Sequence, residues 1–259
     1  MTFGPFKTYI ALKEESFVSS EEVVAEFLKS YPKFSISSVK NSEKGEAILL
    51  TVGNVPISIM QFTFPVPEDI LTRALAGNRS WSKAKSVLRY HQAHLMVSVL
   101  ASAEDFLDAS AFARCTSVLS AILCRLTPAL AVYWMAGDIL SDVQSFMETE
   151  ANTVKGDPPV DHWLQFMFAE KFQNKSDTPI RIGVTKGLHP FIGRELEFQS
   201  EKISKKEIMR VLQDMAYMCL RKGPCVSDGD VFSDGRHDFH ARFVDQGYQE
   251  GIPAIQLSV

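Results

Sequence analysis

Side chains that could bind a metal ion gather near the end of the chain. They are carboxylates and imidazoles, both ligands of divalent cations, and comprise Asp228, Asp230, His237, Asp238 and His240. If this run forms a strand, Asp238 and His240 share one face, and a neighbouring carboxylate would complete a site. The alternative is a polar hairpin in which the aspartates fix turns. Asp228-Gly229-Asp230 also resembles the start of a calcium loop, but Phe239 stands where that loop needs its final glutamate.

Two further histidines, His91 and His94, stand at the polar start of the apolar stretch Tyr90 to Val99. That stretch predicts a strand, and residues three apart in a strand point to opposite faces. We therefore expect one histidine hydrogen-bonded in the core and the other at the surface, not a shared metal.

Catalytic patterns are weak in this sequence. There is no Gly-x-Ser-x-Gly nucleophile pattern. Residues 183–194 carry three glycines together with Lys186, His189 and Arg194, but they lack the order and the following helix of a phosphate-binding loop. The sequence favours a protein without enzymatic activity and calls for no cofactor.

Large aromatic residues are the candidates for binding another protein, because such side chains anchor protein interfaces. They are Trp81, Tyr133, Trp134 and Trp163. Tyr133 and Trp134 end an expected strand just before Gly137, where a groove could open. Neighbours in a strand face opposite ways, so at least one of this pair is expected in the core.

Composition predicts an ordinary globular protein: of 259 residues, 46% are hydrophobic and 22% charged. The net charge of −4 provides no general attraction to nucleic acid or to an anionic membrane. The longest apolar stretch, Cys115 to Met135, is interrupted by Arg125 and Pro128, and the first residues lack a secretory signal pattern. Four cysteines without a Cys-x-x-Cys pair indicate a reduced, cytoplasmic protein.

The pattern of elements predicts an α+β fold of antiparallel-rich mixed sheets covered by helices. One strand, one helix and three strands are expected before residue 65, with a turn at 40–45 and a tight hairpin at Gly53-Asn54. A strand at 90–100, a long apolar helix and a strand at 128–134 have the spacing of a crossover between parallel neighbours. Asp138 is expected to lead into a helix.

Two packed α+β subdomains, 1–150 and 151–259, are expected to meet at a polar linker, residues 148–161. In the second, His162 to Phe168 and Glu195 to Phe198 predict strands, with a turn at 174–178 between them. Because charged and apolar residues alternate, Glu195 to Phe198 is expected to face solvent.

Short motifs from about residue 62 onward resemble a bacterial family called domain of unknown function 4261. They are Phe64-Pro65-Val66-Pro67, Trp81, Tyr90-His91-Gln92-Ala93-His94, Ala131-Val132-Tyr133-Trp134, His162-Trp163, the Gly187 to Glu195 segment and Asp228-Gly229-Asp230. The family has no assigned activity. The resemblance implies an association with toxin–immunity and secretion gene neighbourhoods in bacteria, and so binding rather than catalysis.

The resulting expectation is a cytoplasmic, non-catalytic protein-binding module whose partner is a toxin or a secretion component. An immunity protein that neutralises a cognate bacterial toxin is its most specific form. The alternative is a metal-dependent enzyme or ligand binder that uses the C-terminal Asp/His cluster. A structural subunit of a larger assembly is the third possibility.

Overall fold

The computed structural model describes residues 6–42, 45–78, 81–172 and 179–259. Helix and strand take up nearly equal shares, 34% and 32%, in two mostly antiparallel sheets packed against helices. The predicted α+β class is therefore confirmed. The turn predicted at 40–45 lies partly outside the described residues, and the turn predicted at 174–178 lies wholly outside them.

The first sheet has seven strands in the order β2-β3-β4-β5-β1-β6-β7, with all neighbours antiparallel. Its strands are β1 (Lys7–Leu12), β2 (Ile36–Asn41), β3 (Ala47–Val52), β4 (Val55–Phe62), β5 (Ala93–Val99), β6 (Ala129–Trp134) and β7 (Ile139–Asp142). The predicted hairpin at Gly53-Asn54 joins β3 to β4, where Val52 lies opposite Val55.

β5 and β6 are not neighbours, so that prediction is wrong. Both pair with β1, where Ile10 lies opposite Leu95 on one side and Val132 on the other. The two strands run parallel to each other, as a crossover requires, but β1 lies between them. The spacing of local elements does not reveal that a strand from the start of the chain takes the central place.

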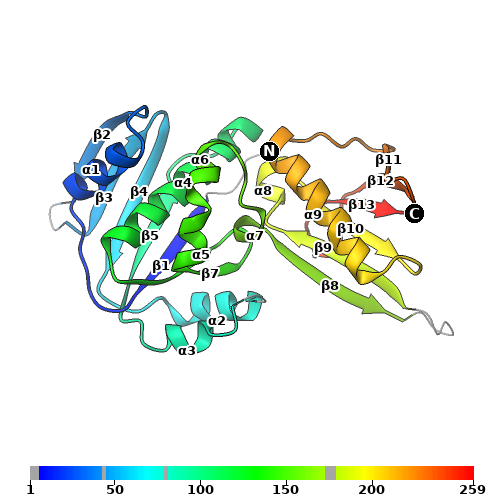
Figure 1. Cartoon of the computed structure of the whole chain (residues 1–259), viewed down its shortest axis with the longest axis horizontal. Coiled ribbons are helices and arrows are strands. Elements are labelled where there is room, and N and C mark those ends of the chain that lie inside the picture. The colour runs from blue at the N-terminus through cyan, green and yellow to red at the C-terminus, as the bar shows by residue number, and fades with distance from the viewer. Residues whose placement is uncertain (1–5, 43–44, 79–80, 173–178) are drawn as a thin grey trace.

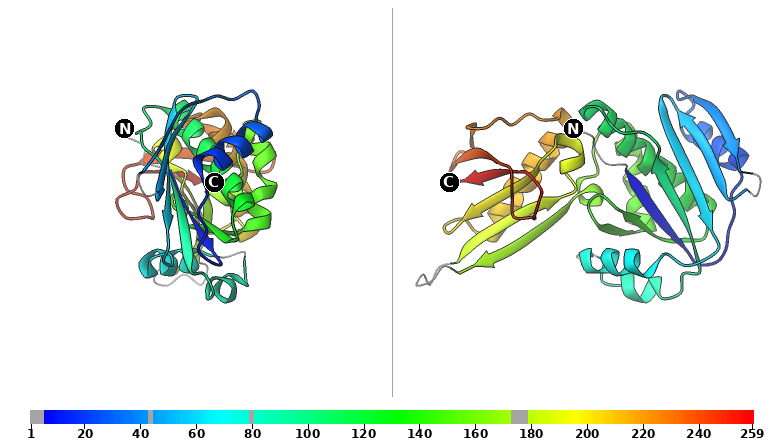
Figure 2. Two further views of the ribbon diagram at one scale, coloured as in Figure 1. Left: turned by 90° about the vertical axis from the view of Figure 1, so that its left-hand side faces the viewer. Right: turned by 180° about the vertical axis from the view of Figure 1, so that it is seen from behind.

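Helices cover both faces of this sheet unequally (Figures 1 and 2). One face carries α1 (Ser20–Ser30), α4 (Phe106–Leu126), α5 (Val143–Glu148) and α6 (Glu150–Val154). The other carries α2 (Glu68–Gly77) and α3 (Ala84–Leu88), which lie at one end of the strands. Ile70, Ala74 and Leu88 from these two helices form a small separate core with Tyr133 and Leu140.

α4 is the central helix of the protein. It packs on β1, β4, β5 and β6 and also on α1, α5, α6 and α8 (His189–Ile192). Its N-cap is Asp105, which accepts from the Asp108 amide. By length and composition α4 is the one described helix apolar enough to cross a membrane; 61% of its most apolar window is buried inside the protein, and the core helix of a soluble protein passes the same test.

The second sheet has six strands in the order β11-β12-β13-β10-β9-β8. Its strands are β8 (Gln165–Lys171), β9 (Ile180–Lys186), β10 (Glu195–Ser200), β11 (Val231–Ser233), β12 (Asp238–Val244) and β13 (Ala254–Ser258). β10 and β13 are parallel, and the other described neighbours are antiparallel. α9 (Lys205–Lys222), which starts with a capping box between Ser204 and Glu207, lies across one face (Figure 1).

Three local predictions differ from the structure. Residues 139–142 form strand β7, and the helix begins only at Val143, because Asp142 caps it. His162 belongs to the short helix α7 (Val160–Trp163), which precedes β8. The expected linker, 148–161, contains α6, whose Thr153 is fully buried against α4.

Four aromatic rings close on one another where the two sheets meet. Trp134 stacks on Trp163 at 5.7 Å between centroids, and Trp163 stacks on Phe191 at 5.4 Å. Phe6 completes the ring at 5.0 Å from Phe191 and 5.7 Å from Trp134. All four side chains are at most 1% exposed, so the two sheets share one continuous core.

The backbone is equally tight beside these rings. A Cβ on Gly137 would lie 2.2 Å from the Trp163 carbonyl oxygen, and one on Gly187 would lie 2.7 Å from the same atom. Only glycine lets the β6–β7 turn and the end of β9 approach α7 this closely.

We expect Phe191→Ala to lower the free energy of unfolding by about 3 kcal/mol, because it removes the ring that contacts both Phe6 and Trp163. Phe17→Ala is the control, since the Phe17 side chain is 54% exposed. Urea unfolding measures both. Equal losses in the two variants would contradict the role given to the aromatic junction.

Candidate functional site

An apolar groove opens beside α4, between α1 and the tip of the β3–β4 hairpin. Its cavity volume is about 590 Å³, within the range of ligand-binding pockets. Four distant segments line it: α1 with the residues after it, the tip of the β3–β4 hairpin, the first half of α4 with its preceding loop, and Val154 of α6. We call this cavity the α1–α4 groove.

Two large apolar side chains at the groove are exposed to solvent. Leu107, in the first turn of α4, is 72% exposed, and Phe34, after α1, is 48% exposed. Phe34 also belongs to an edge-to-face trio with Phe27 and Tyr31, whose centroids lie 5.5–6.3 Å apart. Exposed apolar side chains grouped around a cavity are typical of a binding surface.

A charged network under the groove holds α1, α4 and α6 together. Arg125 of α4 donates to Glu26 of α1 at 3.0 Å and pairs through two nitrogens with Glu150 of α6. The Tyr31 hydroxyl donates to the same Glu150 carboxylate. Burial is the main cause that raises the pKa of Tyr31, and the hydrogen bond to Glu150 adds to it. Tyr31 therefore stays a neutral donor at physiological pH.

The predicted binding tryptophans lie elsewhere. Trp134 and Trp163 are each 1% exposed, so the prediction that they contact a partner is wrong for this structure. They are buried because both rings fill the junction between the sheets. Tyr133 points to the opposite face of its strand, as predicted, but it is only 3% exposed; Trp81 packs beside α2 and α3 and is partly exposed.

Tyr133 belongs to a polar cluster that joins the two halves. Its hydroxyl donates to Asp138, and the Lys186 ammonium pairs with the same carboxylate. Asp138 sits in the left-handed region at φ +52°, which aspartate tolerates better than most residues. Burial first, and then Asp138, raise the pKa of Tyr133, so its hydroxyl remains a donor that links β6 to the turn after it.

The segment compared above with a phosphate-binding loop holds a carboxyl group of the protein itself. The amides of Gly187, Leu188 and His189 donate to the Glu195 carboxylate at 2.8–3.1 Å, and the Thr185 hydroxyl donates to it at 2.7 Å. Lys186 is paired with Asp138 as described. Each of these four donors is therefore already hydrogen-bonded to Glu195 of the same chain.

Burial of Glu195 also corrects the prediction that β10 faces solvent. Both of its glutamates are buried, Glu195 at 3% exposed and Glu197 at 1%. Glu197 accepts from the Tyr248 amide at 2.7 Å and from Gln256 at 3.0 Å. Alternation of charge predicted the strand correctly, but the charged positions find donors in the core instead of water.

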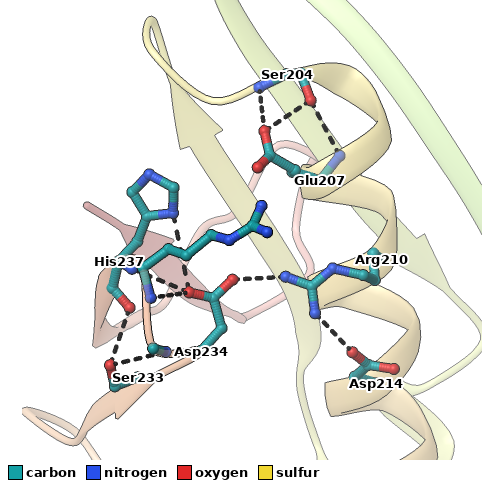
Figure 3. Close-up of polar contacts among 9 residues, drawn as sticks. Ser204, Glu207, Arg210, Asp214, Ser233, Asp234 and His237 are labelled. Atoms are coloured by element: carbon teal, nitrogen blue, oxygen red, sulfur yellow. Dashed lines mark hydrogen bonds and ion pairs between the residues drawn. The ribbon is translucent and has the colours of Figure 1, made fainter.

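One C-terminal aspartate fixes a turn, and another ties that turn to β12. Asp228 accepts from the Phe243 amide at 2.6 Å, and Asp230 accepts from the Ser227 amide at 2.7 Å. Asp238 and His240 lie on exposed positions of β12. His237 lies beside Asp234, whose carboxylate accepts from the His237 amide and pairs with Arg210 (Figure 3). Among the described residues no group of three or more His, Cys, Asp or Glu side chains is placed to hold a metal ion.

His91 and His94 make separate hydrogen bonds and do not share a ligand. His94 is 2% exposed, and its Nδ1 lies 2.9 Å from the Phe64 carbonyl oxygen. His91 is partly buried, and its Nε2 accepts from the Val66 amide at 3.0 Å. Burial lowers the pKa of His94, so the ring is neutral at physiological pH and binds the loop after β4.

A serine–histidine pair was not anticipated from the sequence. The Ser141 hydroxyl lies 2.8 Å from Nδ1 of His162, an arrangement that can activate a nucleophile. Ser141 is only 6% exposed, and neither residue lines the α1–α4 groove. Burial lowers the pKa of His162. The pair connects β7 to α7 and stabilises the contact between these two elements.

Comparisons with protein-family models, with curated proteins and with solved structures each found no match to this chain. The resemblance to the bacterial family of unknown function stays a prediction.

The Glu195→Gln variant isolates the contribution of Glu195 to the pH dependence of folding stability. Burial is the larger effect and raises the pKa of Glu195 to about 7, against the hydrogen bonds that lower it. Folding therefore favours the neutral acid. The stability this contributes is full below about pH 4.5 and is lost as the pH rises through about 7, by an amount on the order of 3 kcal/mol.

Urea titrations measure the free energy of unfolding of the native protein and of Glu195→Gln. We expect the native value minus the variant value to fall over this pH range. Taking the difference cancels the buried histidines, which act in the opposite direction. A difference that is constant with pH, or that rises, would contradict this account.

Asp228→Asn and Asp230→Asn are each expected to lower stability by about 1 kcal/mol, because each weakens the hydrogen bond that the aspartate accepts from a backbone amide. The melting temperature with and without a chelator measures this, and the chelator is expected to make no difference. If zinc, manganese or calcium raised the melting temperature of the native chain but not of these variants, the aspartates would be metal ligands instead.

Proposed function

We propose that this protein is a non-catalytic binding module that holds another protein in the α1–α4 groove. The carrying observation is the cavity of about 590 Å³ bordered by exposed Leu107 and Phe34. Apolar side chains left in water beside a ready cavity gain free energy when a partner covers them. The network of Arg125, Glu26 and Glu150 holds the walls in place before binding, which reduces the entropy lost on association.

The chemistry of the remaining polar clusters supports binding over catalysis. Glu195, Asp138 and His162 are buried or partly buried groups of the types that serve as catalytic acids and bases. Each, however, is hydrogen-bonded to another part of the chain, and none lines the groove.

The partner that we propose is a bacterial toxin or a secretion component, met in the cytoplasm, with this protein acting as its immunity protein. The motif resemblance described above supports this identity. The groove supports the mode of binding: a bound partner would cover Leu107 and would be inhibited while it is bound.

Leu107→Lys is expected to abolish capture of the partner from the native host, because it places a charge in the apolar contact. Leu107 is 72% exposed, so the fold is expected to stay intact by circular dichroism. Val231→Lys is the matched control, on an exposed site of β11 in the other sheet. Affinity capture with mass spectrometry measures both. A stoichiometric partner that Leu107→Lys retains would contradict the proposal.

A further inference from the structure

We infer that the partner enters the α1–α4 groove as an amphipathic α-helix with basic side chains beside its apolar stripe. This inference rests on the proposed function and adds the chemistry of the partner segment. It depends on two properties of the groove lining: which backbone groups the lining offers, and which charges stand at its rim.

The described lining offers no free strand edge. The β3–β4 hairpin contributes only its tip, Val52 to Val55, and both of its strands are paired on each side within the sheet. The Gly53 amide is already bonded to the Ser35 carbonyl oxygen at 3.0 Å. All other lining elements are helices or their flanking loops. An inserted segment must therefore satisfy its own backbone hydrogen bonds, which a helix does and an added strand does not.

The rim at the start of α4 carries carboxylates. Glu104 and Asp108 both line the groove, and Leu107 lies between them in the sequence. Asp108 accepts from the Glu104 amide at 3.1 Å. The Glu104 carboxylate has no hydrogen bond or ion pair with any other described residue. This end of the groove therefore presents an apolar anchor point beside negative charge.

One positive charge lines the groove as well, on Arg114, whose Nε donates to the Ser110 carbonyl oxygen at 3.3 Å. The carboxylates outnumber it. Across the cavity, Phe27, Tyr31 and Phe34 offer aromatic rings, and such rings attract a cation on an apolar stem. Lysine or arginine on the partner helix suits both walls, whereas aspartate or glutamate would meet the rim carboxylates with like charge.

The test uses two synthetic peptides labelled with fluorescein. One is an amphipathic Leu/Lys helix about four turns long; the other has the same leucine pattern with glutamate in place of lysine. Fluorescence polarisation measures binding to the full-length chain at low and at high salt. We expect the Leu/Lys peptide to bind at least about tenfold more tightly than the Leu/Glu peptide, and salt to reduce this difference.

Two sets of variants locate the site. Glu104→Gln combined with Asp108→Asn is expected to weaken Leu/Lys binding by about tenfold and leave the Leu/Glu peptide unaffected or bound more tightly. Asparagine keeps an acceptor for the Glu104 amide. The control pair, Glu201→Gln with Asp245→Asn, removes the same charge from exposed loops of the other half and is expected to change nothing.

The outcomes separate this inference from the proposed function. If both peptides bind equally and Leu107→Lys weakens both, the groove binds apolar segments but the basic helix is wrong. If the control pair weakens Leu/Lys binding as much as the rim pair does, the attraction is general and the inference fails. The inference of a basic helix also fails if the Leu/Lys peptide does not bind. It fails likewise if a small apolar dye fills the groove and the peptide cannot displace it. The proposed function has a separate test: it is contradicted if the Leu107→Lys variant still captures the partner.

Discussion

The aromatic junction of Phe6, Trp134, Trp163 and Phe191 is the contact on which the rest of the structure depends. Each ring lies 5.0–5.7 Å from two others, and the indole of Trp163 also donates to Ser117 of α4 at 2.8 Å. The rings come from β6, α7, α8 and the residue just before β1, so the contact fixes both sheets to the central helix. Pairs of this kind add about 0.5–1.5 kcal/mol each beyond the area they bury.

The position of α4 has two consequences. The second half of α4 lies against the sheet, where Ser120 meets Thr8 at 2.6 Å. Its first half extends beyond that contact and forms a wall of the α1–α4 groove. A single helix thus contributes to the core along its length and presents Leu107 to solvent in its first turn, and the fold that holds it in place also holds the groove open.

Local chemistry was predictable from the sequence. Gly53-Asn54 was predicted as a tight hairpin turn, and it joins β3 to β4. The structure confirms this turn because its signal lies in the two turn residues themselves. Glu195 shows the limit: its alternating pattern indicated an exposed strand, while its donors come from the turn formed by residues 187–189.

The groove was not predictable, because its lining comes from four segments that meet only through the fold. One signal was present. α4 is a long apolar helix that packs on the sheet and on four other helices, yet Leu107 in its first turn is exposed. An apolar side chain left in solvent at the border of a cavity is typical of a binding surface. The candidate aromatic residues failed as markers because the same ring chemistry stabilises cores and interfaces alike.

The most direct test of the central claim is site-specific photo-crosslinking in the native host, with a photoreactive amino acid at position 107 of the full chain. We expect one predominant protein adduct, attached through an apolar segment of the partner, and no such adduct from the same group at position 231 on β11. Adducts shared by both positions, or none from position 107, would contradict the assignment of the α1–α4 groove as the binding site.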